Sequence, residues 1–306
     1  MSVRPLELLD LPLIYRHRED VAGLDATRVL TRGNPLGAVG LLAHMNPRRH
    51  VYAAVADGGD EAVLGSVIQT RGEPFAKLLY LAPRRHLHNP ELPALIEDLA
   101  AEAGSWGAFH VLAECDEDGE AFVPLRKSGF SVYAWQRMWD VSHITPVEHQ
   151  EGWRRARSVH GPAVQSLYQQ IVPPLLHAVE PQPQIESGWI SSEGQRSFVG
   201  AKHGVYGIVL APLIHPEVTD AGAQLAALIP SLPDRRSRPV YLCVRSYQAW
   251  LEPVLADLGA TGASRQAVMV KHMTRLVKDE QAVKVAQPAR ASVQPSQVTR
   301  MDNGGP

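Results

Sequence analysis

Residues 108–130 read AFHVLAECDEDGEAFVPLRKSGF and are followed by SVYAWQRMWDV at residues 131–141. The stretch joins an apolar run at Ala108–Cys115, a helical pattern that ends at Gly129, and a second run in which apolar residues alternate with polar ones. Runs of this kind, bounded by turn residues, predict a strand, a helix and another strand. Gly129 stands where a left-handed residue commonly ends a helix.

The same order of elements returns later in the chain. Residues 238–245 read RPVYLCVR, residues 246–260 read SYQAWLEPVLADLGA, and residues 264–273 read SRQAVMVKHM. Three pairs of identical residues are 130 positions apart: Leu112 and Leu242, Gly129 and Gly259, and Gln136 and Gln266. Upstream, Leu81-Ala82-Pro83 recurs as Leu210-Ala211-Pro212 at an offset of 129. Ordered matches at nearly constant spacing indicate a tandem duplication.

The segments before each copy predict further matching elements. Before the first copy we expect a strand at Val3–Leu8, a helix from about Asp10, a hairpin of Val51–Ala56 and Val63–Thr70, a strand at Phe75–Ala82 and a helix at Leu92–Ala103. Before the second we expect a helix at Pro162–Val172, strands at Arg196–Lys202 and Val205–Leu213, and a helix at Ala221–Leu228. The Gly-rich residues 31–49 show no clear pattern. Antiparallel strands followed by strand–helix–strand predict an α+β fold, in which each copy has a mixed, mostly antiparallel sheet flanked by helices.

The composition excludes several classes of protein. The 306 residues carry 30 Lys and Arg against 32 Asp and Glu, a net charge of -2, which argues against a nucleic-acid binder that relies on a general positive field. No stretch approaches the ~20 apolar residues of a membrane span, and Glu7 and Asp10 interrupt the N-terminal segment where a signal peptide needs an apolar core. Cys115 and Cys243 are too few for a disulfide framework or a Cys-rich zinc site. We therefore expect a cytoplasmic protein without a membrane span.

These observations predict four segments along the chain. They are a first domain at 1–140, a linker at 141–152, a second domain at 153–277 and a tail at 278–306. The tail has no aromatic residue and little periodic apolar content. It cannot bury enough surface to offset its loss of conformational entropy on folding, so we expect it to be disordered.

One motif resembles a known family. Leu-Arg-Lys-Ser-Gly-Phe at Leu125–Phe130 is similar to the Tyr-Glu-Lys-Leu-Gly-Phe helix end of the GNAT acyl-CoA N-acyltransferase superfamily, and Leu-Ala-Asp-Leu-Gly-Ala at Leu255–Ala260 occupies the same place in the second copy. The resemblance covers roughly residues 1–275 as two tandem GNAT-like domains. It implies acetyl-CoA as the acyl donor and direct transfer to an amine, either a small molecule or a protein N-terminus or lysine, with no covalent enzyme intermediate.

The resemblance also points to a cofactor site after the third strand of each copy. In the family, a Gly-rich turn there lets backbone amides at a helix N-terminus approach the pyrophosphate. The first copy has no glycine there and offers two arginines instead, whereas the second has a small Ala-Gly-Ala triplet beside Asp220. The alternatives are solvated arginines in the first copy and a helix N-capped by Thr219 or Asp220 in the second. The candidate cofactor-binding residues are Leu81, Arg84, Arg85, Leu210, Ala221, Gly222 and Ala223, and we expect the second copy to be the binding one.

The sequence selects no catalytic residue. The family's tyrosine, four residues before the Gly of Gly-Phe, is replaced by Leu125 and Leu255. Glu73 or Glu114 could act as a base, but nothing distinguishes them. His86 and His88 form a His-x-His with no carboxylate or Cys at ligand spacing nearby, so no metal site is expected. Two interpretations stay open: a divergent GNAT-type N-acyltransferase, or a non-catalytic module that keeps the fold to bind acyl-CoA or a protein partner.

Overall fold

The computed structural model describes residues 2–37, 48–58, 61–145, 152–192 and 195–273. Half of the predicted linker, residues 146–151, and all of the predicted tail at 278–306 lie outside these residues.

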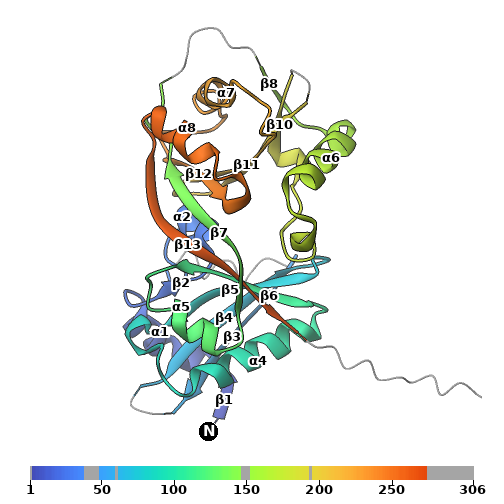
Figure 1. The fold of residues 1–306 in the computed structure, drawn as a ribbon. Coiled ribbons are helices and arrows are strands. Elements are labelled where there is room, and N and C mark those ends of the chain that lie inside the picture. The colour runs from blue at the N-terminus through green and yellow to red at the C-terminus, as the bar shows by residue number, and fades with distance from the viewer. Residues whose placement is uncertain (1, 38–47, 59–60, 146–151, 193–194, 274–306) are drawn as a thin grey trace, which may run out of the picture. The chain divides into compact units, whose positions relative to one another are not determined.

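The first half of the chain contains the strands and helices that the sequence predicts, with two additions (Figure 1). Its elements are β1 (Ser2–Pro5), α1 (Leu11–His17), β2 (Ala22–Gly23), α2 (Ala26–Arg32), β3 (Arg49–Asp57), β4 (Val63–Thr70), β5 (Phe75–Ala82), α4 (Leu92–Ser105), β6 (His110–Asp116), α5 (Phe122–Lys127) and β7 (Ser131–Asp140). The additions are β2 and α2. Helix α2 begins after Asp25, whose carboxylate accepts a hydrogen bond from the Arg28 backbone N–H, as an N-cap residue does.

The second half repeats this order without counterparts of β2 and α2, and its β8 and β9 are additions to the prediction. Its elements are β8 (Trp153–Arg155), α6 (Gly161–Ile171), β9 (Gly188–Ser191), β10 (Ser197–His203), β11 (Ile208–Ile214), α7 (Ala221–Leu228), β12 (Val240–Arg245), α8 (Leu251–Asp257) and β13 (Thr261–His272). Strand β11 begins three residues later than predicted because residues 204–207 form a turn, closed by a hydrogen bond from the Gly204 N–H to the Gly207 carbonyl.

Both glycines that were predicted to end helices adopt the left-handed conformation. The φ angles are +88° at Gly129 and +81° at Gly259. In each case the next residue donates its N–H to a carbonyl of the last helical turn: Phe130 to Leu125, and Ala260 to Leu255. These contacts give the two halves the same helix end before their last strands.

The strands of the described chain form one sheet of 13 strands. Its order is β1-β3-β4-β5-β6-β13-β7-β12-β11-β10-β9-β8, and β2 pairs with β5 off this path. Most neighbours are antiparallel, and the two parallel pairs are β5 with β6 and β11 with β12. Leu112 lies opposite Lys77 in the first pair, and Leu242 lies opposite Leu210 in the second, so these two leucines occupy corresponding strands.

The last strand of each half pairs with the other half. Strand β13 lies between β6 and β7, and β7 lies between β13 and β12 (Figure 1). Gln136 and Gln266, which the offset of 130 identifies as equivalent, face each other across β7 and β13, and their side chains are hydrogen-bonded at 2.9 Å. A residue that pairs with its own equivalent marks a local two-fold relation between the halves. The sequence gives no sign of this exchange.

Helices cover both faces of the sheet. In the first half α4 and α5 enclose one apolar cluster and α1 lies over another, while α7 and α8 cover the corresponding part of the second half. Helix α2 belongs to the first half by sequence, but its Ala26 joins Met138 of β7 and Val209 of β11 in a buried cluster. The halves therefore share a core as well as a sheet.

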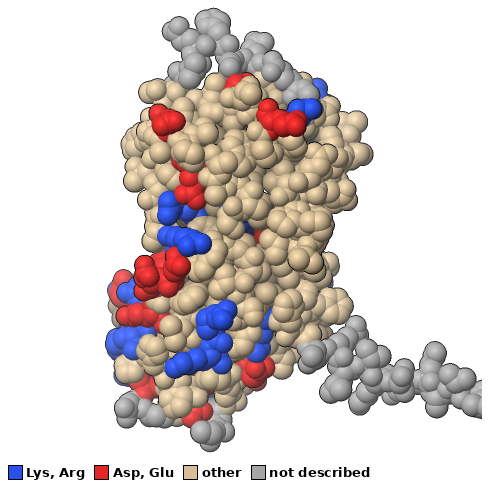
Figure 2. Space-filling model, in the orientation of Figure 1, with Lys and Arg blue, Asp and Glu red and all other residues tan. Residues whose placement is uncertain are grey.

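The surface in Figure 2 carries charges of both signs. Acidic and basic side chains alternate along one edge of this face, and much of the remainder carries neither. Among the described residues no helix is both long and apolar enough to cross a membrane.

Candidate functional site

Two gaps open where parallel strands diverge. Strands β5 and β6 pair only as far as Lys77 and Leu112, and β11 and β12 only as far as Leu210 and Leu242. Beyond these points the facing edges would leave backbone N–H and C=O groups without a strand partner, and a buried backbone group needs a partner. What fills each gap therefore decides what each half can bind.

In the first half, the chain itself fills the gap. Ala22 lies opposite Leu81, and Gly23 lies opposite Tyr80, in an antiparallel pairing with β5. The Leu24 N–H donates to the Leu79 carbonyl at 2.9 Å. On the other side, the Glu114 N–H donates to the Leu24 carbonyl at 2.8 Å, which ties the segment to β6. Residues 22–24 thus serve as a short strand between the two.

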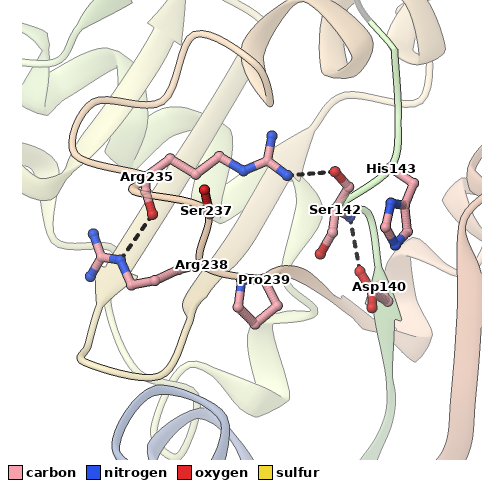
Figure 3. A pocket seen from close by; sticks show the side chains of 7 residues that line it. All are labelled: Asp140, Ser142, His143, Arg235, Ser237, Arg238 and Pro239. Atoms are coloured by element: carbon pink, nitrogen blue, oxygen red, sulfur yellow. Dashed lines mark hydrogen bonds between the residues drawn. The ribbon is translucent and has the colours of Figure 1, made fainter.

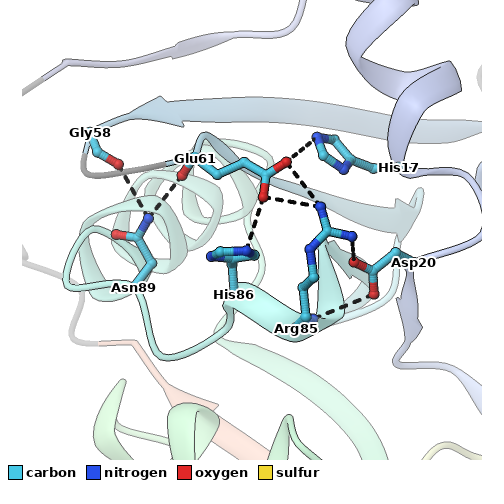
Figure 4. A network of polar contacts seen from close by, with 7 residues as sticks. All are labelled: His17, Asp20, Gly58, Glu61, Arg85, His86 and Asn89. Carbon is cyan, nitrogen blue, oxygen red and sulfur yellow. Dashed lines mark hydrogen bonds and ion pairs between the residues drawn. The ribbon is translucent and has the colours of Figure 1, made fainter.

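The turn after β5 is also occupied from within (Figure 4). The Arg84 N–H donates to the Asp20 carbonyl at 2.9 Å, and the Arg85 guanidinium lies 2.6 Å from an Asp20 carboxylate oxygen. The same guanidinium contacts both carboxylate oxygens of Glu61 at 3.1 Å, and His86 Nε2 lies 3.0 Å from Glu61. Two carboxylates therefore pair with Arg85, one of the two arginines that the resemblance offers as phosphate ligands in the first half.

In the second half, one side chain fills the gap. The Ile214 N–H donates to Gln248 Oε1 at 3.0 Å, and Gln248 Nε2 donates to the Pro212 carbonyl at 2.8 Å. Gln248 follows β12 and is 1% exposed. The Gln248 amide supplies one donor and one acceptor to the edge of β11. The backbone of residues 22–24 supplies donors and acceptors to the edge of β5 in the same way.

Helix α7 begins a few residues after β11. Asp220 is its N-cap residue, but the Asp220 carboxylate makes no capping bond and instead accepts from Gln224 Nε2 at 3.0 Å. A side chain at Gly222 would meet Val254 of α8, since an added Cβ would lie 3.0 Å from Val254 Cγ1. The small residue at 222 is therefore explained by the approach of two helices. Gly222 and Ala223 are both half-buried, and Ala221 is buried.

The two candidate leucines are fully buried. The side chains of Leu81 and Leu210 belong to the apolar clusters of the first and second halves, and their backbones pair with Ala22 and Leu242, respectively. The strand register also shows that Leu210 corresponds to Lys77 and that Leu81 corresponds to Ile214. The matching Leu-Ala-Pro triplets do not occupy equivalent positions in the sheet.

Of the two acidic candidates, Glu114 is already engaged within the fold. Glu114 is buried, and its Oε2 accepts from the Ala26 N–H at 2.8 Å, at the start of α2. Burial raises the pKa of Glu73, and the nearby positive charges of Lys202 and Lys77 oppose this rise. Leu125 and Leu255, at the positions of the family's tyrosine, are both fully buried in apolar clusters.

A buried ionic network joins the halves close to the first gap. The Arg245 Nε lies 3.0 Å from Glu180 Oε1, and an Arg245 Nη lies 3.8 Å from Glu114. Lys77 pairs with Asp25 at 3.3 Å. Burial alone would lower the pKa of Arg245, but Glu180 and its other partners raise it well above the ordinary value, so the guanidinium stays charged. Lys77, Glu114 and Arg245 line a cavity of about 10 Å³, roughly the space for one water.

A larger, open cavity of about 520 Å³ lies at the opposite end of β12 (Figure 3). Arg235 donates to the Ser142 carbonyl at 2.5 Å, Ser142 N–H donates to Asp140 at 2.9 Å, and Arg238 Nε donates to the Arg235 carbonyl at 3.1 Å. These contacts hold the loop before β12 against the end of β7. The cavity therefore does not reach Gln248, which follows the other end of β12. In the described residues no group of three or more His, Cys, Asp or Glu side chains could hold a metal ion.

The sequence analysis missed the residues that fill the gaps. Asp20, residues 22–24 and Gln248 belong to no recognisable motif, and their roles depend on strands far away in the sequence. No local pattern could have identified them.

Comparisons with known proteins show the fold. No protein-family model matches the chain, and no curated protein matches it either. Among solved structures, a GCN5-related N-acetyltransferase from Sphaerobacter thermophilus has a TM-score of 0.53 at 15% identity, covering 89% of this chain and 95% of its own. A tandem GNAT protein from the clavulanic acid biosynthesis pathway has a TM-score of 0.51 at 14% identity, covering 90% and 99%. A putative acetyltransferase from Pyrococcus horikoshii has a TM-score of 0.52 at 10% identity, covering 89% of each chain.

These similarities confirm the predicted α+β class and the resemblance to GNAT proteins in tandem. Identities of 10–15% show the arrangement of the chain alone. What the chain binds has to be argued from its own residues.

Proposed function

We propose that this chain, with its tandem GNAT fold, binds acetyl-CoA or another acyl-CoA in its second half and transfers the acyl group to an amine. The acceptor is a small amine or a protein N-terminus or lysine. One observation carries the assignment to the second half: its gap is filled by a side chain, whereas the first gap is filled by main chain.

Gln248 can be displaced from the edge of β11 more easily than β2 can be displaced from the edge of β5. To free the edge of β11, Gln248 has to rotate and give up two hydrogen bonds, each with a net contribution of about 0.5–1.5 kcal/mol. The pantetheine arm of an acyl-CoA carries two amide groups that can take over these bonds. To free the edge of β5, the chain has to withdraw β2 and expose Leu24, which is 1% exposed. The first half therefore stays closed.

The start of α7 supports the assignment of the phosphates to the second half. A helix N-terminus favours a phosphate group through its free N–H groups and its dipole. In the second half, the first turn of α7 at Ala221–Ala223 directly follows the turn after β11. In the first half, the amides of Arg84 and Arg85 already donate to Asp20. We therefore assign the cofactor to Ala221, Gly222 and Ala223 and to the backbone near Leu210, and assign no phosphate contact to Arg84 and Arg85.

In the transfer step, the amine attacks the thioester carbonyl carbon, the C–N bond forms, and the C–S bond breaks with release of coenzyme A as a thiolate. The thiolate takes up a proton, and the amine gives one up. Leu255 offers no proton at the position of the family's tyrosine. Water is the proton donor in this proposal, and the protein contributes mainly by holding the two reactants together.

The burial of Gln248 and the leucine at 255 also favour the second interpretation, a non-catalytic module that keeps the fold. Titration of the full chain with acetyl-CoA by calorimetry, followed by an assay for release of free coenzyme A with amine acceptors, distinguishes the two. Binding with one site per chain and release of coenzyme A supports the transferase. Binding without release supports the module, and no binding at millimolar acetyl-CoA contradicts the acyl-CoA site.

Charge substitutions locate the site. Ala223→Glu adds a carboxylate in the first turn of α7, where the helix dipole tolerates it and a phosphate does not. We expect at least tenfold weaker binding. Ala223→Gln has the same size without the charge and is the matched control, and Arg84→Ala tests the first half. Equal binding by Ala223→Glu and Ala223→Gln, together with loss of binding in Arg84→Ala, would move the site to the first half.

A further inference from the structure

Three half-buried arginines lie close together with no carboxylate partner. Arg28 and Arg32 are one turn apart on α2, so they share a helix face, and Arg49 begins β3. Other arginines of the chain pair closely with carboxylates: Arg4 with Asp10 at 2.7 Å is one example. Within the part of the chain that the structure describes, none of the three forms an ion pair, and Arg28 Nη2 is buried with no hydrogen-bond partner.

The three guanidinium groups repel one another. Burial, opposed by the charge of Asp25 and reinforced by the charges of Arg32 and Arg49, lowers the pKa of Arg28 to about 10. Burial also lowers the pKa of Arg49, and Arg32 adds to this, while Glu73 and Asp25 oppose it. Like charges that are partly removed from water cost free energy unless something compensates them.

The carboxylates nearby do not supply that compensation. Asp25 is already engaged, because its Oδ1 accepts from the Arg28 backbone N–H and its Oδ2 pairs with Lys77. Burial raises the pKa of Glu73, which disfavours its charged form. Lys202, on β10 of the second half, adds a further positive charge, and the charge of Lys77 lowers its pKa. Positive groups therefore exceed the carboxylates around the three arginines.

We propose that Arg28, Arg32 and Arg49 form a binding site for a small anion that carries phosphate or carboxylate groups. Guanidinium groups bind both kinds of oxyanion with paired hydrogen bonds, and an anion with several charges offsets the repulsion among three of them. The site uses α2 and β3, so it is separate from α7 and Gln248. It does not depend on acyl-CoA binding.

Thermal melting of the full chain in the presence of anions tests the proposal. The probes are pyrophosphate for the phosphate chemistry and citrate for the carboxylate chemistry, each against potassium chloride at the same ionic strength. We expect at least one probe at millimolar concentration to raise the melting temperature by several degrees. A response to pyrophosphate alone, to citrate alone or to both identifies the ligand chemistry. No response to either overturns the proposal.

Substitutions test whether the rise in melting temperature depends on the three arginines. Arg32→Gln and Arg49→Gln are expected to lose at least half of the shift and to melt no lower than the parent without a probe, because each removes a repulsive charge. Arg126→Gln, an exposed arginine of α5, is the matched control and is expected to keep the full shift. Ala223→Glu is expected to remove only the part of a pyrophosphate shift that belongs to the proposed acyl-CoA site, and the part that remains is the one that Arg32→Gln and Arg49→Gln reduce. An undiminished shift in both Arg32→Gln and Arg49→Gln would overturn the proposal.

Discussion

At the scale of single residues, the amide of Gln248 replaces a length of strand. Pro212 C=O and Ile214 N–H face the gap between β11 and β12, and one planar amide bonds to both. Glutamine can do this because its side chain carries an acceptor and a donor in the same arrangement as a peptide group. The free energy involved can be measured by substitution.

Gln248→Leu is expected to lower the free energy of unfolding by several kcal/mol. Leucine has a similar size but leaves two buried backbone groups without partners, and each such group costs about 1–3 kcal/mol. Urea denaturation of parent and variant gives the difference. Gln170→Leu, at an exposed position of α6 where the glutamine bonds only to Ser166, is the control and is expected to change stability by less than about 0.5 kcal/mol. Equal effects at both positions would contradict the role given to Gln248.

His17 makes stability depend on pH. The ring is fully buried, neither nitrogen has a hydrogen-bond partner, and Nε2 lies 3.6 Å from Glu61 Oε1 (Figure 4). Burial lowers the pKa of His17 below its usual 6.5, and the charge of Glu61 opposes this only in part. As pH falls below 6.5, the unfolded state takes up a proton that the folded state does not, so stability decreases.

We therefore expect the melting temperature of the parent to fall more steeply between pH 7 and pH 5 than that of His17→Leu. Thermal melts at half-unit steps of pH measure both slopes. His88→Leu, at an exposed position of the loop before α4, should keep the slope of the parent. If the melting temperatures of the parent and of His17→Leu fall equally with pH, His17 has the same pKa in the folded and the unfolded state, which would contradict this prediction.

At the scale of elements, β2 and α2 are consecutive segments that connect the first half of the sheet to the second. The two-residue strand fills the first gap, and the helix that follows it carries the arginine cluster and reaches the second half through Ala26. Gly23 lets the strand lie against the helix, since an added Cβ would stand 2.5 Å from Val29 Cγ2. This contact predicts the effect of a small substitution.

Gly23→Ala is expected to destabilise the protein by about 1–3 kcal/mol, the usual range for an overpacked site. The obstructing atom is a side-chain methyl, so Gly23→Ala combined with Val29→Ala should recover much of the loss relative to Val29→Ala alone. Chemical denaturation of both single variants and the double variant measures this coupling. Gly152→Ala, where an added Cβ meets nothing within 4 Å, is the control. Strictly additive effects at 23 and 29 would contradict the close contact.

At the scale of the whole molecule, the halves complete each other's sheet. Both neighbours of β7 are strands of the second half, and β6 pairs with β13 instead of with β7. The division into domains at 1–140 and 153–277 stays a prediction that rests on the sequence repeat. Their strands do not form two separate sheets.

A fragment of residues 1–145 is therefore expected not to fold as a monomer. Without β13 and β12, the edges of β6 and β7 lose their partners, and exposed edges promote unfolding or association. Circular dichroism melts and size-exclusion chromatography compare the fragment with the full chain, which is expected to unfold in one cooperative transition. A monomeric fragment with a cooperative melt of its own would contradict this prediction.

The sequence by itself determined the order of most strands and helices, the helix ends at Gly129 and Gly259, and the repeat that places Leu112 and Leu242 in corresponding strands. These features follow from periodicity and from local backbone preferences, which neighbouring residues fix. The same information led to the resemblance with GNAT proteins, because that resemblance rests on a short motif at a helix end.

Only the tertiary structure decided how the gaps are filled and how the halves join. Residues 22–24 act through β5 and β6, Gln248 acts through β11, and β13 enters the sheet beside a strand more than a hundred residues away. The Leu-Ala-Pro triplets, which suggested one alignment of the strands, lie at different levels of the sheet. Such contacts depend on which distant backbone groups remain unpaired, and a local pattern carries no information about that.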